Sequence, residues 1–161
     1  MVIGILAAIS IVAYNNVQQK ARDSQRAQDI ATITKALEMY YVDKGEYPAG
    51  SGAGAPLNGA WSTTNDNSWQ NLATALSPYI STLPVDPTND GTGYNSGTYG
   101  YSYFSNGEAG AGGIHYCGAS APRKMYILAY RLESGSQKQE TVGNCSTRFL
   151  TNSNSYYRAV K

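Results

Sequence analysis

The sequence predicts an α+β fold, in which one long N-terminal α-helix packs by its second half on a small antiparallel β-sheet. Two observations lead to this prediction. Residues 1–19 carry no charge and are followed by apolar residues at helical spacing, whereas alternation with a period of two begins only near Thr98. The length of 161 residues suits one domain, or one small domain with an appendage.

Composition narrows the class of protein. Charged residues make up 14% of the chain, against roughly 25% in an average globular protein, and the formal net charge is +1. This balance is not typical of a protein that binds polyanions, so no specific nucleic-acid partner is predicted. The 14 tyrosines favour half-buried strands and aqueous interfaces. Two cysteines permit one disulfide but not a four-cysteine zinc site, which favours an exported protein.

Residues 1–19 are predicted to form a hydrophobic helical segment suited to a membrane or to the core of a filament. Residues 1–14 are interrupted only by Gly4 and Ser10. About 20 apolar residues are needed to cross a bilayer as a helix, so the run is short unless polar residues lie among the headgroups or further residues precede it. A secretory signal peptide is the alternative, but the run lacks a basic start and a turn-rich cleavage region.

Residues 20–43 are predicted to continue the same helix, from near Met1 to about Val42, as a rod of roughly 60 Å. Apolar residues recur there at spacings of three and four, at Ala27, Ile30, Ala31, Thr34, Leu37 and Tyr41, with Ile33 and Tyr40 widening the stripe. The residues expected to pack on the sheet are Ile30, Ile33, Leu37 and Tyr41. The charges at Lys20, Arg22, Asp23, Arg26 and Asp29 are expected to be solvated, with pairing between neighbouring copies as the alternative.

Residues 44–97 are predicted to connect the helix to the sheet. Gly45 ends the helix and Pro48 prevents it from resuming. Residues 49–67 are predicted to be a loop anchored by Leu57 and Trp61. A short helix near residues 68–77 is expected, capped by Ser68 and closed by Pro78, with its apolar face made of Trp69, Leu72, Ala73 and Leu76. Residues 83–91 form a cluster of turn-forming residues.

Residues 98–161 are predicted to form the antiparallel sheet and a disulfide loop. The expected strands lie around residues 99–103, 126–132 and 156–160, with a weaker one within 141–150. His115 and Cys117, with Asp86 or Asp90, have the residue types of a thiol hydrolase. We favour a Cys117–Cys145 disulfide, which would stabilise by roughly 3–4 kcal/mol and consume the thiol nucleophile. No catalytic residue is therefore predicted.

Three stretches resemble the type IV pilin and pseudopilin family. Residues 4–11, GILAAISI, are similar to the N-terminal core commonly written GILAAIAIP. Residues 35–48, KALEMYYVDKGEYP, are similar to the end of the long helix in major pseudopilins of type II secretion and in many pilins. Residues 78–87 contain the proline-tyrosine and the later Leu-Pro-x-Asp-Pro turn of pseudopilins. The family's cleavage signature does not precede Gly4, so Met1 is expected to be an internal residue of a longer chain.

The resemblance implies a structural subunit rather than an enzyme. Within this family, the predicted disulfide and the long loops favour a major pilin. Such a subunit is held in the cytoplasmic (inner) membrane, is handled by a pilus assembly machinery, and polymerises with itself into an extracellular type IV pilus for adhesion, motility or DNA uptake. The residues implied for the filament core are Ile3, Gly4, Ile5, Leu6, Ala7, Ala8, Ile9, Ser10, Ile11, Val12 and Tyr14. The first alternative is a type II secretion pseudopilin. The second is a membrane-anchored extracellular binding domain or enzyme.

A calcium site is implied in the turn that contains Asp86 and Asp90, because the similar loop binds calcium in some pseudopilins. Asp86, Asn89 and Asp90 supply the hard oxygen ligands that calcium prefers. The alternative is that Asp and Asn simply form the turn. No other cofactor is expected.

Overall fold

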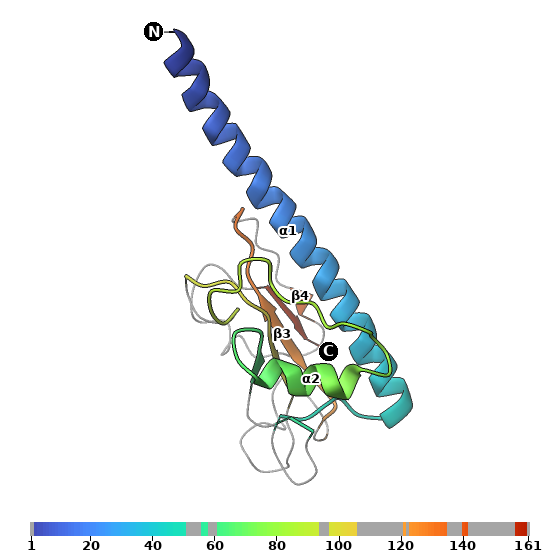
Figure 1. Cartoon of the computed structure of the whole chain (residues 1–161). Helices are drawn as coiled ribbons and strands as arrows, with labels where there is room; N and C mark the ends of the chain where they lie inside the picture. Colours follow the sequence, from blue (N-terminus) through green and yellow to red (C-terminus); the bar gives the residue numbers. More distant parts are fainter. Residues whose placement is uncertain are drawn as a thin grey trace.

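The computed structural model contains one long helix against a small sheet and a short second helix (Figure 1). It describes the backbone of residues 2–50, 56–57, 61–93, 97–105, 121, 123–134, 140–141 and 157–160, and the side chains of these ranges between positions 13 and 134. The predicted α+β class, with a long N-terminal helix on an antiparallel sheet, is confirmed.

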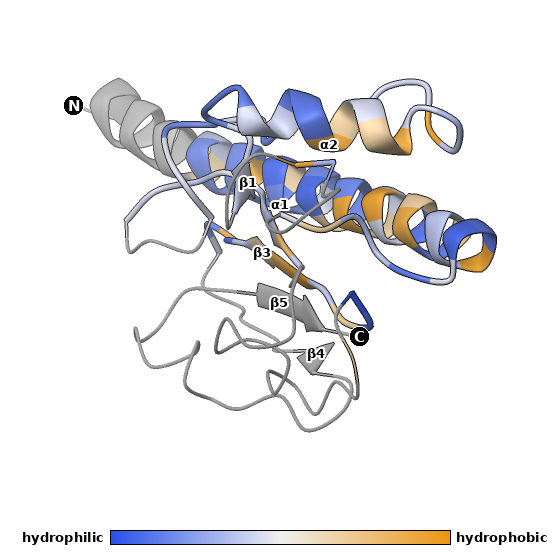
Figure 2. Ribbon diagram, turned by 90° about the horizontal axis from the view of Figure 1, so that it is seen from below, coloured by the Kyte–Doolittle hydropathy of each residue, from blue (hydrophilic) through white to orange (hydrophobic). Residues whose placement is uncertain are grey.

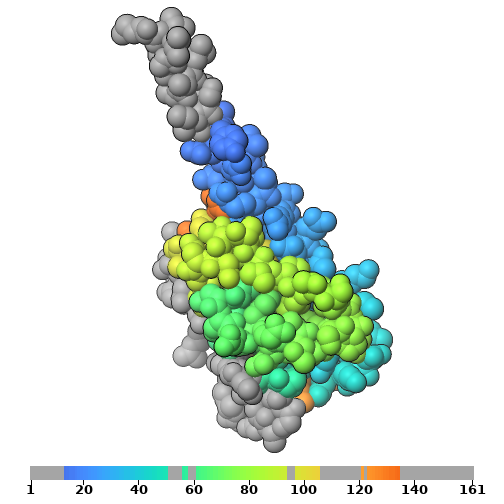
Figure 3. All heavy atoms as spheres, viewed as in Figure 1, coloured from blue at the N-terminus to red at the C-terminus, as the bar shows by residue number. Residues whose placement is uncertain are grey.

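Helix α1 (Val2–Lys44) is continuous over 43 residues, which corresponds to about 64 Å at 1.5 Å per residue. It contains no proline, and its only glycine is Gly4. Gly45 ends the helix in the left-handed region, with φ of 71°, and its N–H donates to the carbonyl of Tyr41 at 2.8 Å. This is the glycine-terminated helix end that the sequence predicts. The N-terminal part of α1 projects well beyond the rest of the molecule (Figures 1 and 3).

The second half of α1 packs on the core through one face. Ile30, Ile33 and Leu37 are buried in the main hydrophobic cluster, and Tyr41 packs against it, as the helical spacing predicts. Ala27 and Ala31 were expected on the same stripe, but both are exposed. The buried face instead continues toward the N-terminus through Arg26 and Asp23, because these positions lie four and seven residues before Ile30.

Helix α2 (Ser68–Leu76) lies beside α1 (Figure 2). Its buried face contains Trp69, Leu72 and Leu76, as predicted, and the indole N–H of Trp69 donates to the carbonyl of Pro84 at 3.0 Å. Ser68 was expected to cap this helix. The Asp66 carboxylate accepts the backbone N–H of Ser68 at 2.7 Å instead, while the Ser68 hydroxyl accepts the N–H of Thr63 at 2.9 Å. A carboxylate two residues earlier thus supplies the acceptor expected from Ser68.

The sheet has five strands in the order β1-β2-β3-β5-β4. The strands are β1 (Ser62–Thr63), β2 (Ser102–Phe104), β3 (Ile127–Tyr130), β4 (Glu140–Thr141) and β5 (Tyr157–Val160). The pairs β1–β2, β2–β3 and β3–β5 are antiparallel, as predicted, but β4 pairs parallel to β5. Strand β1 lies within residues 49–67, which were predicted to form only a loop. A strand of two residues is too short to show the alternation of apolar and polar residues by which strands are predicted.

The central strands carry aromatic side chains into the core. Tyr103 is opposite Leu128 in the β2–β3 register, and both are buried in the same cluster as the face of α1. The Tyr103 hydroxyl donates to the carbonyl of Pro48 at 2.8 Å. Ile127 and Ala129 are also buried, so β3 is covered on both faces. This strand therefore differs from the common antiparallel arrangement, in which one side of the sheet is solvated.

Several predicted features lie outside the described residues. These are Cys117, Cys145 and His115, and the side chains of the filament-core residues from Ile3 to Val12, whose backbone is helical.

Candidate assembly surface and its anchor

We call the part of the molecule that follows α1, with the sheet and α2, the head. The face of α1 turned away from the head is exposed and carries large apolar side chains. Val17 is 65% exposed, Met39 is 44% exposed and Val42 is 83% exposed. Tyr14, near the point from which the helix projects, is 64% exposed. Because these side chains recur along one face of the helix, this face of α1 is a candidate contact surface.

This outward face is almost uncharged. Between positions 21 and 42, its exposed residues are Ala21, Ser24, Gln25, Ala27, Gln28, Ala31, Thr32, Lys35, Met39 and Val42. Lys35 is the only one with a formal charge. The solvated face of a helix normally carries the charges, and its core-facing stripe is apolar. Here small and uncharged residues face outward, and small residues allow another backbone to approach closely.

Most charges of this half of α1 are turned toward the head. The Arg26 side chain is 0% exposed. Its guanidinium donates to both oxygens of the Asp86 carboxylate, from Nε at 2.8 Å and from Nη2 at 3.1 Å. It also donates to Glu133 at 2.7 Å, to Asp23 at 3.0 Å and to the hydroxyl of Thr88 at 2.8 Å. These contacts join α1 to the 86–88 turn and to the segment after β3.

Asp23 and Arg22 extend this network. The Asp23 carboxylate accepts the backbone N–H groups of Glu133 at 2.8 Å and Ser134 at 2.9 Å. Arg22 donates to both oxygens of Glu133, at 2.7 and 2.5 Å. We call Arg22, Asp23, Arg26, Asp86 and Glu133 the anchor cluster. It lies where the projecting part of α1 meets the head, and it therefore fixes the direction of the rod.

The ionisation of the anchor cluster follows from these contacts. Burial alone would raise the pKa of Asp23, but the hydrogen bonds from Glu133, Ser134 and Arg26 outweigh it and the pKa is lowered. The hydrogen bond from Arg22 is the largest cause of the lowered pKa of Glu133. Burial opposes the charge of Arg26, yet the hydrogen bonds that it donates to Asp86 and Glu133 raise its pKa. All three groups are therefore ionised near neutral pH.

Aromatic rings line one side of the cluster. The Arg26 guanidinium lies over the ring of Tyr99, 4.7 Å from its centroid, and that of Arg131 lies 5.1 Å from the same centroid. The Tyr101 hydroxyl donates to the Asp29 carboxylate at 2.8 Å. Burial of Asp29 raises its pKa. The side chains at positions 22, 23, 26 and 29 thus bind groups of the chain's own head, and for these four the expectation that they are solvated or paired between copies is wrong. Lys20 is exposed, as expected.

The predicted calcium turn is held by internal hydrogen bonds. The Oδ1 atom of Asp86 accepts the N–H groups of Thr88 at 2.8 Å and Asn89 at 3.3 Å, in addition to its bond from Arg26. Asp90 accepts the N–H of Tyr99 at 2.6 Å. Asn89 has φ of 48°, a conformation that asparagine tolerates in turns. Within the described part of the chain, no three His, Cys, Asp or Glu residues form a group able to hold a metal ion.

The model of one family, described as type II secretion system (T2SS) protein G, matches residues 13–120, more than half of the chain. The chain belongs to this protein G family. Comparison with curated proteins and with solved structures gave no significant match. Protein G is a pseudopilin, related to the pilins, so the family resemblance predicted from the sequence is confirmed.

The protein G family is a family of structural subunits of a secretion system. Its members are made as membrane-anchored precursors and assemble with copies of themselves, and with a secretion or pilus machinery, into filaments. A search of the described residues found no helix long and apolar enough to cross a membrane. The matched range begins at Ala13, so it covers the half of α1 that carries the anchor cluster.

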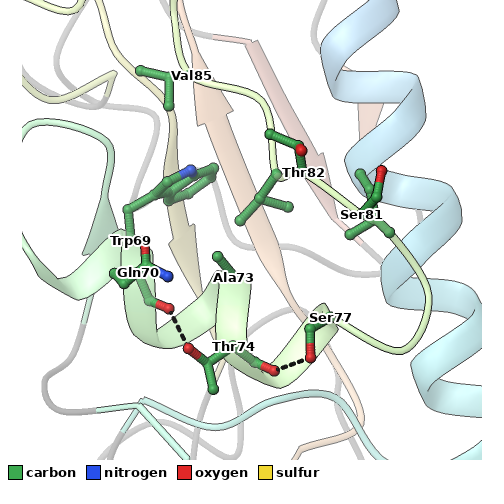
Figure 4. A pocket seen from close by; sticks show the side chains of 10 residues that line it. Trp69, Gln70, Ala73, Thr74, Ser77, Ser81, Thr82 and Val85 are labelled. Carbon is green, nitrogen blue, oxygen red and sulfur yellow. Dashed lines mark hydrogen bonds between the residues drawn. The ribbon is translucent and has the colours of Figure 1, made fainter.

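A groove of about 530 Å³ separates α2 from the segment that follows it (Figure 4). Trp69 and Ala73 line one side, Thr82 and Val85 the other. The hydroxyls of Thr74 and Ser77 are used within α2, because each donates to a backbone carbonyl one turn earlier, at 2.9 Å. The lining includes no carboxyl, imidazole, thiol or amine, so this groove offers no general acid or base.

Sequence reasoning missed the anchor cluster, although the position of Arg26 on the apolar stripe could have indicated that this residue is buried. Charged residues are seldom fully buried unless they are paired, so a run of alternating charges is most simply interpreted as solvated. However, Arg26 lies four residues before Ile30, at the spacing of the apolar stripe, and Asp86 supplies an acidic partner in a segment with strong turn signals. The pairing spans 60 residues of sequence, and no local pattern reports it.

Proposed function

We propose that this chain is the structural subunit of a helical filament, and specifically the major pilin of a type IV pilus. The observation that carries the proposal is the geometry of α1. Its N-terminal part projects beyond the head (Figure 1), and between positions 21 and 42 its outward face is partly apolar and carries a single charge, at Lys35. In an isolated subunit in water, such a projecting helix makes no stabilising contacts. In a filament, a continuous helix of this kind contacts other copies.

The energetics of residues 1–19 support assembly. Exposure of apolar surface costs roughly 25 cal/mol per Å², so the ten large apolar side chains of this segment would cost tens of kcal/mol in water. Two surroundings remove this cost, a lipid bilayer before assembly and a bundle of the same segments afterwards. The sequence contains small residues at Gly4, Ala7, Ala8 and Ser10, which suit close contact between helices.

The shape of the subunit supports a fibre rather than a closed ring. The rod at one end and the head at the other differ in shape and chemistry, so contacts between copies join two different surfaces. Repetition of such a contact with an axial step generates an open helical filament. In that arrangement the rods lie inside, and the heads with their loops face outward.

A second candidate function is that of a type II secretion pseudopilin, whose short filament moves folded cargo across the envelope. The match to the protein G family favours this candidate. Both candidates use the same rod and the same kind of contact, and they differ in the length and place of the filament. A calcium ion in the turn of Asp86 and Asp90 would favour the pseudopilin.

Electron microscopy of sheared surface fractions, with mass spectrometry to identify this chain, tests the proposal. Long fibres that contain the chain, and that disappear when its gene is deleted, are the expected result. If the deletion leaves surface fibres intact but stops the export of folded proteins, the pseudopilin candidate is correct. Detection only of detergent-soluble single subunits in the source cells would contradict both.

A further inference from the structure

The acidic turn at residues 86–90 is closed by a cation that belongs to the chain itself. Both carboxylate oxygens of Asp86 accept hydrogen bonds from Arg26, and neither side chain is exposed to solvent. We propose that the Arg26 guanidinium is the built-in cation of this turn, which therefore folds and stays attached to α1 without calcium. This proposal concerns the folded subunit and does not depend on which filament it forms.

The ligand set of the turn does not fit calcium. Calcium takes six to eight oxygen ligands and prefers carboxylates that point at it. Asp86 directs its oxygens to the guanidinium and to two backbone N–H groups, and Asp90 directs its Oδ1 to the N–H of Tyr99. A divalent ion at Asp86 would also meet the positive charge of Arg26, whose nitrogen lies 2.8 Å from the carboxylate.

Arg26 performs the joining role that a metal ion has in other proteins. Carboxylates from three separate segments meet it: Asp23 on α1, Asp86 in the turn and Glu133 after β3. The planar guanidinium has five N–H donors, and it bonds Asp86 with a two-pronged geometry that a lysine ammonium cannot reproduce. Thr88 and the face of Tyr99 complete its surroundings. Because this cation is covalently part of α1, chelators cannot remove it.

Thermal unfolding of the full-length chain in detergent micelles, followed by near-ultraviolet circular dichroism, tests the proposal. The midpoint should be the same in excess EDTA and in excess calcium chloride, and calorimetric titration with calcium chloride should show no saturable heat. A calcium-dependent rise in the midpoint that Asp86→Asn abolishes would overturn the proposal. This comparison uses the unaltered chain, so it holds even if a variant of Arg26 cannot fold.

Two variants of Arg26 test the role of the guanidinium. Arg26→Met should lower the midpoint by roughly 10 °C, because it leaves buried carboxylates without their cation. Arg26→Lys should recover only part of this loss, since it restores the charge but not the two-pronged geometry. Lys35→Met is the matched control, because it removes an exposed cation from the opposite face of the same helix. Equal midpoints for Arg26→Met and Lys35→Met would overturn the proposal.

Discussion

Arg26 and Asp86 form a fully buried ion pair across 60 residues of sequence, with the Nε atom 2.8 Å from Oδ2. The pair joins the middle of a long helix to a turn in the head. Buried pairs contribute little net stability compared with a well-packed apolar core, but the loss of one partner is costly and the geometry they impose is specific. In a filament subunit, specific geometry at this point sets the angle between rod and head.

Asp86→Ala should destabilise the folded chain by about 3–5 kcal/mol, because it leaves the Arg26 charge buried without its main partner. The double variant, which combines Asp86→Ala with Arg26→Met, should lose clearly less free energy of unfolding than the two single variants lose together. Urea unfolding of the four proteins in the same detergent measures the difference. Additive costs would show that the two side chains do not stabilise each other.

Acid should loosen the anchor cluster. Asp23 and Glu133 have lowered pKa values in the folded chain, so their contribution is complete above the ordinary carboxyl pKa of about 4 and is lost as the pH falls through the lowered values. Acid has the opposite effect through Asp29, whose pKa is raised in the folded chain. Protonation of Asp29 favours the folded chain and offsets part of the stability that Asp23 and Glu133 lose.

The acid dependence is measured as the unfolding midpoint between neutral pH and pH about 3. Stability should be nearly constant down to pH about 5 and should fall below it. Asp23→Asn should be less stable at neutral pH and should show a shallower fall. If the variant and the original chain lose stability in parallel on acidification, Asp23 is not one of the groups responsible.

Leu37→Ala should cost about 2–5 kcal/mol, because Leu37 is 0% exposed in the main core. Met39→Ala, two residues later on the outward face, should change the free energy of unfolding by no more than about 0.5 kcal/mol. Denaturant unfolding of both variants gives the comparison. Similar costs at the two positions would mean that the helix packs on the head through a different face.

Val42→Glu should reduce filament formation while leaving the unfolding midpoint of the subunit unchanged. Val42 is 83% exposed at the far end of the outward face, so a charge there is tolerated in the free subunit but not in a contact between copies. Val85→Glu, at a 46% exposed valine of the head groove, is the matched control. Counts of fibres by electron microscopy should fall for Val42→Glu only. Equal counts for the two variants would show that the far end of α1 is not part of the assembly surface.

The long helix and its contact with the sheet could be predicted because they follow from local patterns. The spacing of Ile30, Ile33 and Leu37 defines one face, and Gly45 marks the end of the helix. The short helix was found for the same reason, through Trp69, Leu72 and Leu76, although its acceptor is Asp66 rather than Ser68.

The anchor cluster and the strand order could not be predicted, because both depend on contacts distant in sequence. Nothing local to Arg26 indicates that Asp86 and Glu133 will surround it, and charge alone favours solvent. Strand β1 has only two residues, and the parallel pairing of β4 with β5 depends on how the connecting chain returns. The outward face of α1 could not be predicted either, because alanines such as Ala27 and Ala31 are equally compatible with a buried apolar stripe and with an exposed contact surface.

The most direct test of the central claim, that α1 is the assembly element, is analytical ultracentrifugation of the purified full-length chain as detergent is removed. We expect single subunits in detergent to convert into large fibrous particles, and we expect deletion of residues 1–19 to leave the head as single subunits. A full-length chain that remains a dispersed single subunit in plain buffer would contradict this role of α1.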